Sequence, residues 1–147
     1  MDDKTVFLEL SALLTGLYDD LIKDPTKRSL NTPASEQYRR LLMGSFPVKL
    51  KALLDAYRSL ASVMPKPEID DTLLAAFKTT NAFQDKDTEF VARQIVNIWY
   101  FSQYREIPDG GFLDGGFYER GFAWERIGAH PTGFSNQPFG YWAAKPA

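Results

Sequence analysis

The chain contains no cysteine at all. This absence excludes disulfide bonds, thiolate metal sites and thiol nucleophiles within the chain. Histidine is almost absent as well, since His130 is the single copy. Carboxylates alone would have to hold a metal ion, and we therefore expect no metal site.

Long apolar runs and basic runs are also missing. No stretch approaches the roughly 20 apolar residues of a membrane helix, so we expect no direct membrane span. Lysine and arginine form no run longer than Arg39-Arg40, and the formal net charge is −2. This balance gives no electrostatic reason to bind nucleic acid or an anionic membrane. The first 20 residues are acidic before their apolar part, unlike a signal peptide. We expect no export signal in the sequence, which leaves a cytoplasmic location open.

Catalytic motifs are not found. There is no G-x-S-x-G nucleophile elbow, no G-x-G-x-x-G and no phosphate-loop lysine. We interpret His130 as a loop residue that is hydrogen-bonded through its ring. The tail carboxylates Asp114, Glu119 and Glu125 are candidates for an acid/base pair, but arginines directly follow both glutamates. That arrangement favours surface ion pairs, and we expect the chain itself to be non-catalytic, with no cofactor of its own.

Helical periodicity dominates the first 106 residues. It predicts an all-α fold of about five helices in a compact bundle, with little or no sheet. The predicted helices span residues 5–23, 33–43, 47–64, 69–78 and 85–101.

Three details of these helices are specific enough to check. Pro25 should end the first helix, whereas Thr32 and Pro33 should cap and begin the second, which Gly44 should end. The block IVNIWYF, residues 95–101, is apolar nearly all round. A helix of that kind is usually central in a bundle or covered on a second face.

The last 41 residues, Ile107 to Ala147, have a different composition. They hold eight of the ten glycines and nine of the 21 aromatics. Glycine at this density disfavours long regular elements, and the aromatics argue against a solvated tail. We therefore divide the chain into a helical domain, residues 1–106, and an extended C-terminal arm, residues 107–147. The part of the arm through about Trp124 should lie over the IVNIWYF helix.

The arm begins with the local echo DGGFLDGGF, residues 109–117. Asp-Gly is a turn dipeptide, so two successive tight turns are expected. The alternative is a backbone-lined pocket or a calcium loop. Too few oxygen ligands have the spacing of a helix–loop–helix calcium site.

Three blocks of the sequence resemble a known family. They are FLELSALLTG at residues 7–16, IVNIWYF at residues 95–101 and PFGYWAAKP at residues 138–146. In this order the chain resembles the small (gamma) subunit of bacterial membrane-bound, FAD-dependent sugar and polyol dehydrogenase complexes of the sorbitol, fructose and glucose types. The resemblance covers nearly the whole chain.

The resemblance implies a non-catalytic, chaperone-like role in an oxidoreductase complex. In that family a large flavoprotein subunit holds FAD and oxidises the sugar, and a cytochrome c subunit often passes the electrons on. The small subunit stabilises the large one and often carries the twin-arginine signal for export to the periplasm. A periplasmic location is thus implied by the resemblance alone.

Three departures from the family pattern are visible. Some members carry a tail cysteine that forms a disulfide to the large subunit, whereas residues 127–131 here contain none. No twin-arginine segment is present. The stretch between Ile107 and Trp124 is also longer and richer in glycine than the family leads us to expect.

We therefore expect an accessory subunit whose arm packs on its own helices and on a partner subunit. Aromatic side chains bury much area at little entropic cost. The expected partner-binding residues are Trp124, Phe134, Phe139, Tyr141, Trp142 and Pro146. Two alternatives stay open. One is a free-standing carbohydrate-binding or hydrolytic domain that uses the aromatic tail with Glu119 or Glu125. The other is a self-associating structural protein.

Overall fold

The computed structural model describes residues 2–63, 71–117 and 121–122 of the chain. In these residues the fold is an all-α bundle with seven helical elements and one small hairpin. The helices are α1 (Asp3–Thr15), the π-helix η1 (Asp19–Lys23), α2 (Pro25–Ser45), α3 (Pro47–Val63), α4 (Asp71–Lys78), α5 (Asn81–Gln84) and α6 (Lys86–Phe101). The strands β1 (Gln103–Tyr104) and β2 (Leu113–Asp114) pair antiparallel, with Tyr104 opposite Leu113. The expected all-α bundle with little sheet is confirmed for this part of the chain.

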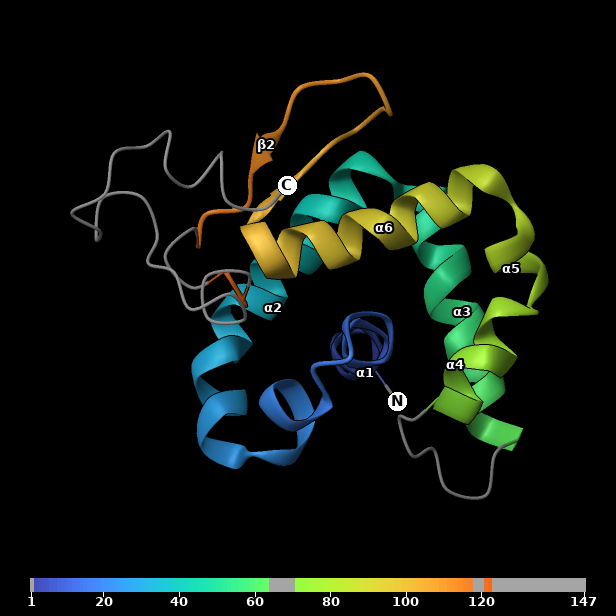
Figure 1. Cartoon of the computed structure of the whole chain (residues 1–147), viewed down its shortest axis with the longest axis horizontal. Helices are drawn as coiled ribbons and strands as arrows, with labels where there is room; N and C mark the ends of the chain where they lie inside the picture. Colours follow the sequence, from blue (N-terminus) through green and yellow to red (C-terminus); the bar gives the residue numbers. More distant parts are fainter. Residues whose placement is uncertain (1, 64–70, 118–120, 123–147) are drawn as a thin grey trace.

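Helix α1 is the centre of the bundle. Figure 1 views it end-on, with η1 and α2 on one side, α6 above it, and α3 to α5 on the other side. Its side chains Val6, Phe7 and Leu10 are fully buried. Burial of a large apolar side chain contributes about 1.5–3 kcal/mol each, so this helix organises the core.

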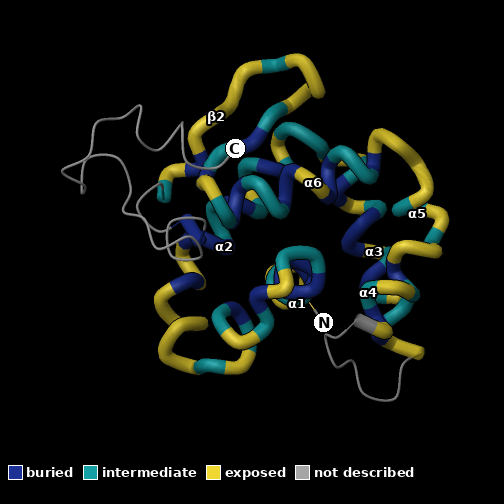
Figure 2. Tube along the Cα trace, in the orientation of Figure 1, coloured by how far each residue is buried: buried dark blue, intermediate teal, exposed yellow. Residues whose placement is uncertain are grey.

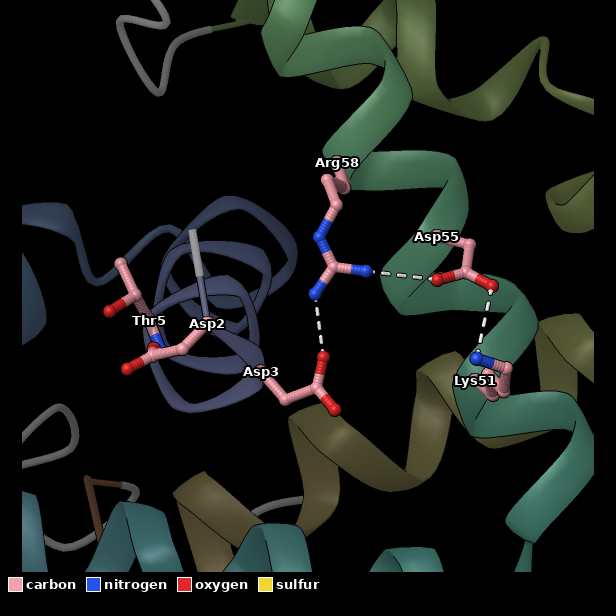
Figure 3. A network of polar contacts seen from close by, with 6 residues as sticks. All are labelled: Asp2, Asp3, Thr5, Lys51, Asp55 and Arg58. Carbon is pink, nitrogen blue, oxygen red and sulfur yellow. Dashed lines mark hydrogen bonds and ion pairs between the residues drawn. The ribbon is translucent and has the colours of Figure 1, made fainter.

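The N-terminus of α1 is joined to α3 by a surface network (Figure 3). Asp2 caps α1 by accepting a 2.8 Å hydrogen bond from the Thr5 N–H. Arg58 of α3 lies between two carboxylates, 2.6 Å from Asp3 Oδ1 and 3.0 Å from Asp55 Oδ1. Exposed ion pairs contribute little to stability, so the packing of α1 in the core, and not this network, holds the helix in place.

The first predicted helix was too long. Helix α1 ends at Thr15, where Gly16 adopts a left-handed conformation with φ 75° and its N–H bonds to Ala12 O. Leu17 and Leu21 keep the apolar spacing and are buried, but Leu21 belongs to η1. The periodicity was correct, while the interruption at glycine was missed.

The predicted second helix was wrong at both ends. Helix α2 begins at Pro25, because Asp24 caps it by accepting hydrogen bonds from the N–H groups of Thr26 and Lys27. Pro33 lies inside this helix, and Gly44 lies in its last turn without ending it. The Thr32 hydroxyl donates to Arg28 O within the helix instead of capping a new one.

The other helix predictions agree closely with the structure. Helix α3 begins at Pro47 as expected, and α6 is capped by Asp85, which accepts from the Thr88 N–H. Helix α4 ends at Lys78 as predicted. The short helix α5 was not predicted.

Candidate partner-binding site

The structure places the start of the C-terminal arm against α6, and one serine makes this possible. Ser102 follows α6 in the left-handed region, with φ 53° and ψ 37°, and its N–H bonds to Ile98 O. This conformation is uncommon for a residue other than glycine and costs roughly 1–2 kcal/mol. Ser102 is fully buried, and all of its polar groups have partners among the described residues.

These partners connect the arm to two helices. The Ser102 carbonyl accepts a 2.6 Å hydrogen bond from the Gly115 N–H. Its Oγ accepts from the Phe117 N–H at 2.8 Å and from the Tyr38 hydroxyl of α2 at 3.1 Å. Gln37 Nε2 donates to Gly115 O at 3.0 Å. We call these five residues the Ser102 junction.

The Ser102 junction requires glycine at position 115. A Cβ atom there would lie 2.8 Å from both the carbonyl oxygen and the Oγ of Ser102. Real Cβ atoms do not approach that closely, so any other residue would push the arm away from α6.

Aromatic rings continue this contact towards residue 122. Tyr38 packs edge-on against Trp99 with 5.0 Å between ring centroids, and against Phe117 with 5.9 Å. Phe122 lies 6.3 Å from Trp99 by the same measure. A Cβ at Gly121 would lie 2.5 Å from Tyr100 O, which places the backbone of the arm directly on the end of α6. Among the described residues, the arm thus contacts the C-terminal end of the IVNIWYF helix, at Trp99 and Tyr100.

The expected boundary between residues 106 and 107 falls inside the hairpin. Residues 105–112 join β1 to β2, and this hairpin loop extends beyond the helices at the top of Figure 1. Its base is fixed by Gln94 of α6, whose Oε1 accepts from the Arg105 N–H at 2.8 Å. Tyr104 is buried beside Phe46, with 6.5 Å between ring centroids.

The first Asp-Gly-Gly sequence lies at a backbone turn, as expected, whereas the second begins in β2 and is held by the Asp114 side chain. In the first, the Gly110 N–H donates to Ile107 O at 3.0 Å. In the second, Asp114 Oδ1 accepts from the Gly116 N–H at 2.8 Å. The Asp114 carboxylate is therefore used in a local hydrogen bond. No group of three histidine or acidic side chains suited to a metal ion occurs among the described residues.

The partner-binding residues expected from the sequence, Trp124, Phe134, Phe139, Tyr141, Trp142 and Pro146, lie outside the described residues. The same holds for Glu119, Glu125 and His130. The structure adds the place where the arm is attached to the helices, at residues 115–117 and 121–122, which precede most of these residues in the sequence. Sequence reasoning missed the Ser102 junction.

The strongest electrostatic effects lie elsewhere in the bundle. Burial, together with the hydrogen bond that its hydroxyl donates to Glu9 Oε1 at 2.8 Å, raises the pKa of Tyr57 well above its ordinary value. The Lys49 ammonium, 2.8 Å from Asp85 Oδ2, lowers the pKa of that carboxyl to about 2, with help from Thr88. The Tyr57–Glu9 contact joins α3 to α1, and the Lys49–Asp85 contact joins α3 to the N-cap of α6. Both contacts hold helices of the fold together.

Within the residues described, no helix is both long enough and apolar enough to cross a membrane. Comparison of the chain with family models, with curated proteins and with solved structures finds no match.

Proposed function

We propose that this chain is a non-catalytic accessory subunit of a sugar or glycoside dehydrogenase complex. It would stabilise a large catalytic subunit that holds FAD, and a cytochrome c subunit would complete the complex. By the same resemblance the complex would work in the periplasm, where related small subunits help to deliver their partners.

The observation that carries this proposal is the contact between two of the resembling blocks. Residues 7–16 lie on α1 and residues 95–101 lie on α6, and these helices pack together in the core. The Tyr100 hydroxyl at the end of α6 donates to Thr15 O at the end of α1, at 3.1 Å. Two blocks far apart in the sequence, joined here by residues 85 positions apart, thus form one packed unit, which supports reading them as parts of one family pattern.

The Ser102 junction supports the proposal that the third resembling block, residues 138–146, holds a partner subunit. It fixes the arm to α2 and α6 at residues 115–117. An arm anchored in this way suits a subunit that holds a partner through its C-terminal aromatics.

Co-expression with the FAD-binding catalytic subunit of a dehydrogenase complex of this type tests the proposal. We expect the two proteins to co-purify. Trp142→Ala should weaken the complex while the helices stay folded, because truncation of a central aromatic anchor typically costs about 2 kcal/mol or more of binding. Saturable binding of simple sugars by the isolated chain, measured by calorimetry, would instead favour a carbohydrate-binding domain.

A further inference from the structure

The chain contains two Asp-Gly dipeptides, Asp109-Gly110 and Asp114-Gly115. Both begin the same tetrapeptide, Asp-Gly-Gly-Phe, so their local chemistry is alike. Their surroundings differ, because the first lies in the hairpin loop and the second belongs to the Ser102 junction. Figure 2 shows most of the loop as exposed. A difference in reactivity between the two dipeptides therefore reports on the fold and not on the sequence.

An Asp-Gly dipeptide carries its own backbone reaction. The glycine nitrogen attacks Cγ of the protonated aspartic acid, an N–Cγ bond forms, and the carboxyl hydroxyl leaves as water with the amide proton. Solvent water then opens the resulting succinimide ring. Opening at Cγ restores aspartate, whereas opening at the backbone carbonyl leaves isoaspartate, in which the main chain runs through Cγ. Glycine favours the attack because it has no Cβ to obstruct the approach and its backbone rotates freely.

The hairpin loop leaves the first dipeptide open to this reaction. Asp109 is exposed, and its carboxylate makes no hydrogen bond or ion pair with any residue that the structure describes. The Gly110 N–H donates to Ile107 O at 3.0 Å, within the same loop. This bond closes a local turn, so its opening displaces no helix, and local openings of that kind cost little free energy.

The Ser102 junction holds both reacting groups of the second dipeptide. Gly115 is buried, and its N–H, the nucleophile, donates to Ser102 O at 2.6 Å. The carbonyl of Gly115 accepts from Gln37 Nε2 at 3.0 Å. The Asp114 carboxylate accepts from the Gly116 N–H at 2.8 Å. Attack on Cγ therefore requires the arm to detach from α2 and α6 first, which makes the opening larger and rarer.

We propose that Asp109-Gly110 is a site of spontaneous isoaspartate formation, and that the Ser102 junction protects the same sequence at Asp114-Gly115. The product has the mass of the original chain, with one more carbon in the backbone of the hairpin loop. The site needs only solvent water, so it does not depend on a partner subunit or on the accessory role.

The test follows both sites in one peptide. The folded chain is kept in warm neutral buffer, sampled over time and cut with trypsin, which releases residues 106–120 as a single peptide. Electron-transfer fragmentation then distinguishes aspartate from isoaspartate at each position. We expect isoaspartate to form at Asp109 at least about tenfold faster than at Asp114, which corresponds to about 1.4 kcal/mol of additional opening free energy. In guanidinium chloride the two rates should become similar.

Each outcome of this comparison decides the proposal. Equal rates in the folded chain, or faster reaction at Asp114, would overturn it. If Asp109 reacts in guanidinium chloride but not in the folded chain, the loop protects its own dipeptide, and the assigned site is wrong.

A variant of α2 tests the protecting role of the junction. Gln37→Ala removes the side chain that binds Gly115 O, and it should raise the rate at Asp114 several-fold, as expected for the loss of one hydrogen bond. The rate at Asp109 should not change. Arg40→Ala, at an exposed position of the same helix, is the matched control and should alter neither rate. Circular dichroism checks that both variants keep their helices. A folded Gln37→Ala chain with an unchanged rate at Asp114 would overturn the protection by the junction.

Discussion

The N–H of Gly115 donates a 2.6 Å hydrogen bond to the carbonyl of Ser102, and no Cβ fits between them. This contact is the point at which the C-terminal arm is fixed to the helical domain. It explains why the chain places a glycine there and a left-handed serine at the end of α6.

Replacement of this glycine tests the attachment. Gly115→Ala should destabilise the chain by about 1–3 kcal/mol, because the added methyl group must displace the arm from Ser102. Gly111→Ala is the control, since nothing lies within 4 Å of the position that its Cβ would take. Urea unfolding followed by circular dichroism gives both values, and equal stability of the two variants would contradict the close contact. Hydrogen exchange at the Phe117 amide should also accelerate in Gly115→Ala only.

The interior proline of α2 gives a second test. Pro33 lacks the N–H that would bond to the carbonyl four residues earlier, which costs roughly 3 kcal/mol inside a helix. It is exposed, so no packing is lost when it is replaced. Pro33→Ala should therefore raise the free energy of unfolding, by about 1–2 kcal/mol once the added freedom of the unfolded chain is counted. A loss of stability would instead favour a helix that begins at Pro33.

The helix boundaries show where sequence reasoning succeeded and where it failed. Helices α3 and α6 have an unbroken apolar stripe, and their extents were predicted well. Helix α2 was misjudged because a local signal, Thr32-Pro33, was weighed above the Asp24 cap and Pro25. Its first turns are also held by tertiary contact, since the buried Asn31 donates to Asp20 O of η1 at 3.2 Å.

The candidate site was predictable only in outline. The composition of the arm indicated that its start would pack on α6, and it does so at Gly121 and Phe122. The Ser102 junction was not predictable, because Tyr38 and Ser102 are 64 residues apart and neither belongs to a motif. The hairpin was missed because each strand has only two residues, too few for an alternating pattern.

The Tyr57–Glu9 contact predicts a loss of stability at alkaline pH. The pKa of Tyr57 is raised in the folded chain by burial and by its bond to Glu9. Its contribution is therefore complete below about pH 10, the ordinary tyrosine pKa, and is lost as pH rises further, because only the unfolded chain releases the proton. Absorbance at tyrosinate wavelengths should show one tyrosine that ionises together with the loss of helical circular dichroism.

The matched variant isolates this contact. Tyr57→Phe should remove that tyrosinate step and lower stability at neutral pH by about 1 kcal/mol, the usual net value of a hydrogen bond. If all tyrosines of the wild-type chain titrate before the helices unfold, the contact does not hold the proton as described.

The cap of α6 predicts the opposite dependence at acidic pH. The pKa of Asp85 is lowered to about 2 by Lys49 and Thr88 from an ordinary value of 3.8. Its contribution is thus present above pH 3.8 and is lost as pH falls towards 2. Asp85→Asn keeps a capping oxygen but loses the ion pair, so it should flatten the acid dependence of Tm. Asp85→Ala should also lower Tm at neutral pH, and identical acid profiles for the wild type and Asp85→Asn would contradict this assignment.

The proposed accessory role is tested most directly by the effect of this chain on the FAD-binding catalytic subunit of a dehydrogenase complex of this type. The measurement is the Tm of the purified flavoprotein, with and without an excess of the chain, together with the mass of the mixture by light scattering. If the chain is the accessory subunit, the two proteins form a stoichiometric complex and the flavoprotein Tm rises with the concentration of added chain, because binding to the folded state alone stabilises it. Separate elution of the two proteins and an unchanged flavoprotein Tm would contradict it.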